Sequence, residues 1–349
     1  MAKSLKPKRL ASVGIAIALF AILIVLSQPW RVLGQDGVQT VINQGTTPRR
    51  FEVALIGDLL YNPKEEAEFP ALIADINRSN AAFVIHDGDI KSGATPCSSE
   101  LLSSRKTTFQ TFRIPFVLVP GDNEWTDCHR TGDDPLEQLT QLRKIFFGTD
   151  YSLGQTVLKL ERQGSVSPVS PSKASLSKSN AKFALYRENV RWVYGSVLFV
   201  GLHVVGSNNN LGRTPAMDQE FQARNQANLA WLKDAFAIAK AQNLSGIMVV
   251  IHANPGFELP PDQRTGFNAF LEDLRSEVLG FDKPVMLVHG DSHTFGIDKP
   301  LFDNQNQRIM RFTRLETFGT PDVHWVKAVI DPSDSSLFRL EPIQVKSSA

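Results

Sequence analysis

Short apolar runs alternate with amphipathic stretches along most of the chain. Six runs are almost continuously apolar: FEVALIG, AAFVIHDGD, IPFVLVPGD, SVLFVGLHVV, GIMVVIH and PVMLVHGD. Short runs of this kind predict strands that are buried on both faces. Between them, residues 64–76, 225–239 and 266–279 place apolar side chains at helical spacing. Strands that alternate with helices predict an α/β architecture.

The N-terminal segment has a different pattern. Lys3, Lys6, Lys8 and Arg9 precede an uncharged apolar run over residues 10–27. A basic stretch before such a run predicts export or membrane anchoring. We interpret residues 1–35 as a signal peptide or a membrane anchor, and both alternatives stay open. In either case the rest of the chain is expected on the periplasmic or extracellular side.

The remaining chain divides into a linker and one folded domain. Residues 36–49 are polar and read as a linker, and residues 50–343 as a single domain. Within that domain, residues 163–180 are rich in Ser, Pro and Lys and lack periodicity, which predicts a surface loop insertion.

Charge and cysteine content add two constraints. The chain has 37 Lys and Arg against 36 Asp and Glu, so its net charge gives no indication of nucleic-acid binding. Cys97 and Cys128 are the two cysteines, and in an exported chain an even number favours a disulfide. The sequence predicts that this bond joins two loops, with two free thiols as the alternative.

Candidate metal ligands stand at the ends of the apolar runs. In chain order they are Asp58, Asp89, Asp122, His252, Asp291 and His293. Functional sites of α/β sheets gather beyond the carboxyl ends of the strands. Any one of these aspartates could simply form a turn or cap a helix. Carboxylates brought together need compensating cations, however, and mixed Asp and His ligands favour Mn, Zn or Fe over Ca.

The order of these motifs resembles the calcineurin-like metallophosphoesterase superfamily over nearly all of the folded region. The matching stretches are GDLL, GDIK, GDNE, IH and GDSH, at residues 57–60, 88–91, 121–124, 251–252 and 290–293. The resemblance implies a four-layer α/β/β/α sandwich with two divalent metal ions. It assigns Asp58 and His293 to the first ion, Asp89 to both, and Asp122, His252 and Asp291 to the second.

The chain departs from the family pattern at four positions. Leu60 stands where the family has a metal-binding histidine, and Asn123 where it has the histidine that acts as general acid or stabilises the transition state. Asp122 replaces an asparagine, and Asp291 replaces a histidine. Tyr61 could approach the first ion as a phenol, or could be a plain pocket aromatic.

The resemblance implies a hydrolase that attacks a phosphate ester with metal-activated water. The candidate catalytic residues are Asn123 by position, His129 as a substitute acid, and Lys91 as a phosphate partner. Arg130 is a further candidate for phosphate contact. The expected partner is a phosphorylated small molecule or another phosphoester, with the membrane as a partner if the N-terminal segment is uncleaved. A non-catalytic relative that binds metal or phosphate is the alternative.

Overall fold

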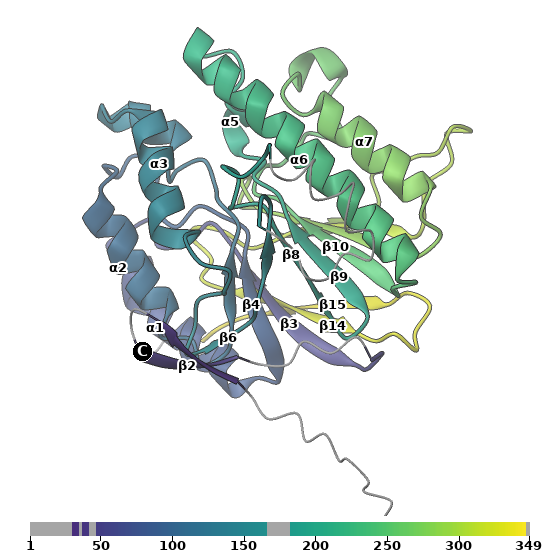
Figure 1. The fold of residues 1–349 in the computed structure, drawn as a ribbon, viewed down its shortest axis with the longest axis horizontal. Coiled ribbons are helices and arrows are strands. Elements are labelled where there is room, and N and C mark those ends of the chain that lie inside the picture. Colours follow the sequence, from purple (N-terminus) through teal and green to yellow (C-terminus); the bar gives the residue numbers. More distant parts are fainter. Residues whose placement is uncertain (1–29, 35–36, 42–46, 166–181, 347–349) are drawn as a thin grey trace, which may run out of the picture.

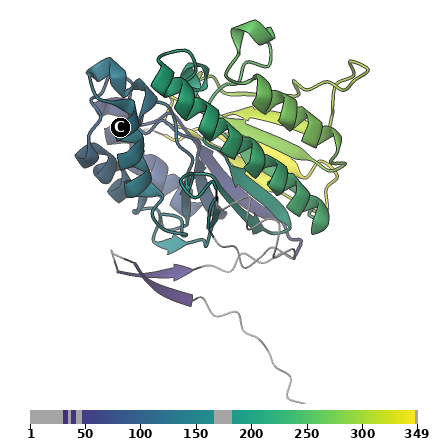
Figure 2. The same cartoon turned by 45° about the horizontal axis from the view of Figure 1, so that its top comes forward.

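Two β-sheets pack face to face, and helices cover both outer faces (Figures 1 and 2). The computed structural model describes residues 30–34, 37–41, 47–165 and 182–346. The five-stranded sheet has the order β15 (Phe338–Ile343), β14 (Trp325–Ile330), β3 (Phe51–Ile56), β4 (Ala81–His86) and β5 (Phe116–Leu118). The strands β3, β4 and β5 are parallel, whereas β14 is antiparallel to its neighbours.

The seven-stranded sheet forms the other half of the sandwich. Its order is β12 (Gly296–Asp298), β13 (Phe312–Glu316), β11 (Val285–His289), β10 (Gly246–Val250), β9 (Val197–Gly201), β8 (Val190–Tyr194) and β7 (Glu161–Arg162). The four strands from β9 to β13 along this order are parallel. All six predicted apolar runs contain strands, namely β3, β4, β5, β9, β10 and β11.

Three apolar clusters separate the layers. The cluster between the sheets includes Val53 and Phe83 from one sheet and Phe199 and Met248 from the other. A second cluster packs β9–β11 against α6 (Pro215–Ala241) and α7 (Asn268–Leu279). A third packs β3–β5 against α1 (Pro63–Arg78), α2 (Ser99–Phe109) and α3 (Pro135–Phe146). The predicted four-layer α/β/β/α sandwich is confirmed.

The helices α1, α2, α3 and α6 begin at residues whose side chains cap them. The Asn62 side chain accepts the backbone N–H groups of Lys64 and Glu65 at the start of α1, where Pro63 occupies the first turn. Thr214 caps α6. The helix begins at Pro215, ten residues before the predicted apolar stripe of 225–239. The short elements are α5 (Gly206–Asn209), η1 (Thr126–Thr131) and η2 (Pro261–Gln263).

A small sheet precedes the sandwich in the chain. It pairs β1 (Trp30–Gly34) with β2 (Gly37–Val41), and β2 with β6 (Thr156–Val157). Part of the predicted linker is therefore a strand, consistent with its Val and Thr content. The apolar run 10–27 and most of the predicted loop 163–180 lie outside the described residues. Among the residues that are described, no helix is long and apolar enough to cross a membrane.

The predicted disulfide is present between Cys97 and Cys128. It ties the loop after β4 to η1, which follows β5. Both sulfur atoms lie 3.8 Å from the carbonyl oxygen of Asn123, so the bond packs directly against the loop of the GDNE motif.

Removing this disulfide with the double change Cys97→Ser and Cys128→Ser is expected to destabilise the chain. The bond spans 31 residues, and a closed loop of that length restricts the unfolded state by about 3 to 4 kcal/mol. Urea unfolding without reductant measures the loss in the free energy of unfolding. An unchanged midpoint and slope would contradict the assignment, as would two free thiols on the denatured, unreduced chain.

Candidate metal centre

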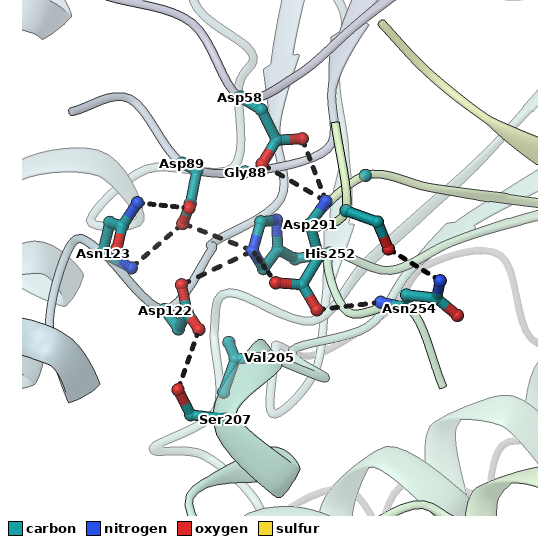
Figure 3. Close-up of polar contacts among 12 residues, drawn as sticks. Asp58, Gly88, Asp89, Asp122, Asn123, Val205, Ser207, His252, Asn254 and Asp291 are labelled. Carbon is teal, nitrogen blue, oxygen red and sulfur yellow. Dashed lines mark hydrogen bonds and ion pairs between the residues drawn. The ribbon is translucent and has the colours of Figure 1, made fainter. Parts of the chain in front are cut away.

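The six predicted ligands lie together at the carboxyl ends of strands from both sheets. Figure 3 labels five of them, all except His293. The loops after β3, β4 and β5 supply the aspartates of one sheet. The loops after β10 and β11 supply His252, Asp291 and His293 of the other. Four of the six side chains are buried, and Asp291 and His293 are half-buried. The centre therefore opens to solvent on the side of the last motif.

One candidate position is formed by Asp122, His252 and Asp291, whose donor atoms lie within 4.8 Å of one another. His252 Nε2 is 3.6 Å from Asp122 Oδ1 and 3.8 Å from Asp291 Oδ1. Asp89 Oδ1 is also close, at 3.3 Å. The Nε2 atom is buried and has no hydrogen-bond partner in the structure. An imidazole nitrogen that faces three carboxylates in this way fits a divalent ion.

Burial and mutual repulsion control the titration of this cluster. Burial raises the pKa of Asp89 well above its usual value and raises the pKa of Asp291 to about 6. Burial acts in the same direction on Asp122, but nearby positive charge, that of His252 and of Arg130, favours its ionised form and its pKa is lowered. Burial alone would lower the pKa of His252, yet the carboxylates, Asp89 foremost, raise it. Without a metal ion, the surrounding carboxylates therefore favour the protonated imidazole of His252.

The Tyr61 hydroxyl lies inside the set expected for the first ion. It donates a hydrogen bond to Asp89 Oδ2 at 2.6 Å and lies 3.4 Å from Asp58 Oδ1. His293 Nε2 is 3.3 Å from the same hydroxyl and 3.4 Å from Asp58 Oδ1. Burial, reinforced by the charges of Asp89 and Asp58, raises the pKa of Tyr61, so the phenol keeps its proton. Tyr61 adds an oxygen where Leu60 left this set one ligand short.

Leu60 points away from the centre. Its side chain is buried in the apolar cluster under α1–α3. Leu60 has φ of 69°. A positive φ is unfavourable for leucine, and burial of the side chain offsets that cost.

The backbone around the centre is strained in several places. Asp58, Asp89, Asp291 and His293 all have φ between 51° and 77°. Such conformations are uncommon outside glycine and cluster at functional sites. The glycines of the motifs allow the close approach of neighbouring carboxylates. A Cβ on Gly290 would lie 2.0 Å from Asp58 Oδ2.

The three predicted catalytic residues are placed differently. Asn123 is buried, donates through its side chain to Asp89 Oδ2 and Tyr61 Oη, and donates its backbone N–H to Asp89 Oδ1. Lys91 is buried and donates to the carbonyl oxygens of Ser92 and Thr95. Burial lowers the pKa of Lys91.

His129 lies on the surface. Its Nδ1 atom is 2.8 Å from the carbonyl oxygen of Thr126 and 3.2 Å from Arg213 Nη1. Of the three predicted catalytic side chains, the structure thus brings only Asn123 into direct contact with a candidate ligand.

The sequence analysis did not identify several residues that lie at the centre. The Ser207 hydroxyl lies 3.3 Å from Asp122 Oδ2 (Figure 3). Asn254 donates its backbone N–H to Asp291 Oδ2 at 3.1 Å. A Cβ on Gly206 would lie 2.4 Å from Asp122 Oδ2 and 2.7 Å from Asp291 Oδ1. No local sequence signal marks these positions, because each reaches the centre through the fold.

The asparagines after β9 build a turn. Asn208, Asn209 and Asn210 have φ of 54°, 56° and 68°, a left-handed turn that Asn tolerates better than most residues. Arg224 is fully buried and donates to both the side-chain and the backbone oxygen of Asn209. This contact fixes the turn that carries Gly206 and Ser207 to the centre.

No protein-family model and no curated protein matches the sequence. Among solved structures, the chain is similar to GAP50, the anchor in the inner membrane complex of Plasmodium, at 11% identity over 86% of this chain and 90% of that one, with a TM-score of 0.43. It is similar to a dimetal phosphatase from Danio rerio at 13% identity over 85% and 99%, with a TM-score of 0.44. It is also similar to the 5'-nucleotidase from Candida albicans at 13% identity over 86% and 52%, with a TM-score of 0.41.

The four layers and the order of the motifs around them are those that the sequence resemblance implies. The described residues form this four-layer sandwich. At its strand ends two groups of donors could hold a divalent metal ion, namely Asp58, Asp89 and His252, and Asp122, His252 and Asp291.

Proposed function

We propose that the chain is a metal-dependent phosphoesterase, which hydrolyses a phosphate ester of a small molecule with metal-activated water. The observation that carries the proposal is the buried His252 Nε2 atom, which has no hydrogen-bond partner and lies 3.3–3.8 Å from three aspartate oxygens. Buried carboxylates at this density need cations. Two divalent ions, Mn, Fe or Zn, would match the four aspartates in charge.

The candidate ligands divide between two positions. We assign Asp122, His252 and Asp291 to one ion, Asp58, His293 and Tyr61 to the other, and Asp89 to both. When bound, the ions would lower the pKa of a water molecule and offset charge on the phosphate.

Asn123 is proposed as a positioning residue. Its amide holds Asp89 and Tyr61 at the same time, so it fixes the carboxylate that both ions would share. An amide does not act as a general acid near neutral pH, so this position cannot replace the missing histidine in proton transfer. Lys91 is proposed to support the loop after β4, since two carbonyl oxygens already accept from its ammonium group.

An exported location is part of the proposal. The disulfide supports it, because such bonds persist in oxidising compartments. The basic and apolar pattern of residues 1–35 supports it as well, with membrane attachment if that segment is retained.

Metal affinity is expected to weaken below pH 6. The Asp291 carboxyl has a pKa of about 6 in the ion-free chain, so an entering ion must displace a proton below that pH. Asp89 and His252, whose pKa values are also raised, must release protons to an entering ion above pH 6 as well. Affinity should therefore fall as the pH falls across the whole range, and by about a further tenfold per pH unit below pH 6 for the Asp291 proton. Titration of the chelator-treated chain with Mn²⁺ from pH 5 to 8 measures this slope, and a flat profile would contradict it.

The proposed function is tested with the purified chain, stripped with chelator and reloaded separately with Mn²⁺, Fe²⁺, Zn²⁺ and Mg²⁺. The substrates are p-nitrophenyl phosphate and bis(p-nitrophenyl) phosphate. We expect hydrolysis with at least one transition-metal ion and none in chelator. A folded, metal-loaded chain that hydrolyses neither ester would reject the enzyme and favour the non-catalytic metal- or phosphate-binding relative.

A further inference from the structure

Two arginines from distant parts of the chain meet at one buried carboxylate beside the metal centre. Asp127, in η1, is 2% exposed. Its Oδ2 atom lies 2.7 Å from Arg130 Nη2, and its Oδ1 atom lies 2.8 Å from Arg213 Nη2. Arg213 comes from the loop before α6 and also donates to the carbonyl oxygen of Thr126 at 2.6 Å. One aspartate thus fixes two guanidinium groups, and one positive charge is left over within this trio.

The trio of Asp127, Arg130 and Arg213 borders the centre at two places, the candidate ligand Asp122 and the positioning residue Asn123. The Ser207 hydroxyl lies 3.3 Å from Asp127 Oδ1 and 3.3 Å from Asp122 Oδ2. Arg130 lies beside Asn123, since a Cβ on Gly93 would be 2.7 Å from Arg130 Nη1 and 2.6 Å from Asn123 Oδ1. The guanidinium groups therefore stand at the edge of the position formed by Asp122, His252 and Asp291.

The exposure of the two arginines suits binding from solution. The Arg130 side chain is 51% exposed and the Arg213 side chain 23%, whereas Asp127, which orients them, is buried. A guanidinium presents five N–H groups, and the contacts to Asp127 and Thr126 use only some of them. The remaining donors are already oriented, so less side-chain entropy is lost when an anion binds.

We propose that Arg130 and Arg213 form an anion subsite that binds a terminal oxygen of a phosphate monoester. This subsite rests on the proposed function, which places the phosphoryl group of the substrate at the two metal ions. A monoester is close to a dianion at neutral pH and has three terminal oxygens. Two of them can face metal ions while the third meets a guanidinium. A diester is a monoanion with two terminal oxygens, so it leaves no such oxygen for the arginines.

Phosphate binding tests the subsite without turnover. The full chain is loaded with Mn²⁺ and titrated with inorganic phosphate in a calorimeter. Arg213→Ala is expected to weaken phosphate binding about tenfold or more, as the loss of a charge-assisted hydrogen bond does. Arg213→Lys keeps the charge but not the planar donor pair, so its phosphate affinity should lie between those of the wild-type chain and Arg213→Ala. Arg130→Ala, at a more exposed side chain, provides a second variant should Arg213→Ala fold poorly.

Arg187 offers a matched control. It makes the same kind of contacts, with Asp150 at 2.8 Å and the carbonyl oxygen of Phe147 at 3.0 Å, and none of these residues belongs to the centre. Arg187→Ala should leave phosphate affinity unchanged. Wild-type affinity in both Arg213→Ala and Arg130→Ala would overturn the subsite. A metal-loaded wild-type chain that does not bind phosphate would overturn it as well.

Turnover separates this inference from the proposed function. The ratio of kcat/KM for p-nitrophenyl phosphate to that for bis(p-nitrophenyl) phosphate should fall about tenfold in Arg213→Ala. An unchanged ratio would overturn the monoester preference. If neither ester is hydrolysed but phosphate binding still depends on Arg213, the proposed hydrolysis fails and the anion subsite stands.

Discussion

The change Asp89→Ala is expected to abolish hydrolysis, with a loss of roughly a thousandfold or more in kcat/KM. Asp89 lies 3.3 Å from His252 Nε2 through Oδ1 and accepts from Tyr61 Oη at 2.6 Å through Oδ2. It therefore connects the two candidate metal positions. Its loss removes the shared ligand and also releases Asn123, which holds it from the loop of the GDNE motif.

The fold should survive this change. Burial raises the pKa of Asp89, so its ionised carboxylate is unfavourable in the ion-free chain and its removal is not expected to unfold it. Thermal unfolding in chelator checks that point. Asp282→Ala, at an exposed aspartate before β11, is the control and should keep full activity. Activity in a folded Asp89→Ala variant close to that of Asp282→Ala would reject the assignment of the centre.

The change Gly206→Ala is expected to weaken metal binding by roughly 10- to 100-fold, the range seen when contacts around metal ligands are disturbed. A Cβ at this glycine would lie 2.4 Å from Asp122 Oδ2 and 2.7 Å from Asp291 Oδ1. These separations are far below contact distance, so at least one carboxylate must move. The turn itself cannot easily move aside, because buried Arg224 holds Asn209 within it.

Gly148→Ala supplies the comparison for this test. A Cβ at Gly148 would meet one backbone oxygen at 3.5 Å, an ordinary contact. Both variants add one methyl group, so a general effect on glycine flexibility would appear in both. Titration of each chelator-treated variant with Mn²⁺ measures the difference. Equal affinities in the two variants would show that the α5 turn does not border an ion.

Six strands, and the position of the candidate ligands after five of them, could be predicted because their signals are local. Runs such as GIMVVIH are apolar throughout, and β10 is buried along its whole length. The ordered Asp and His residues at the strand ends were informative because parallel strands bring their carboxyl ends to one edge. The sequence showed less of β15, an edge strand in which four positions are half-buried, two are exposed and none is fully buried, so no continuous apolar run marks it.

The remaining contacts depend on tertiary structure and leave no local pattern. Arg213 meets Asp127 across 86 positions of the chain, and Ser207 meets Asp122 across 85. Tyr61 differs from these contacts, because its position next to Leu60 already suggested an approach to the first ion, and its hydroxyl lies 2.6 Å from Asp89 Oδ2.

The metal content of the purified chain tests the central claim most directly. Elemental analysis of the wild-type chain, purified without chelator, is compared with that of His252→Ala, which removes the buried imidazole from the three carboxylates. We predict Mn, Fe or Zn in the wild-type chain at a minimum of one ion per molecule, and a marked loss in the variant. A folded wild-type chain that contains no such ion and takes none up from solution would contradict the account.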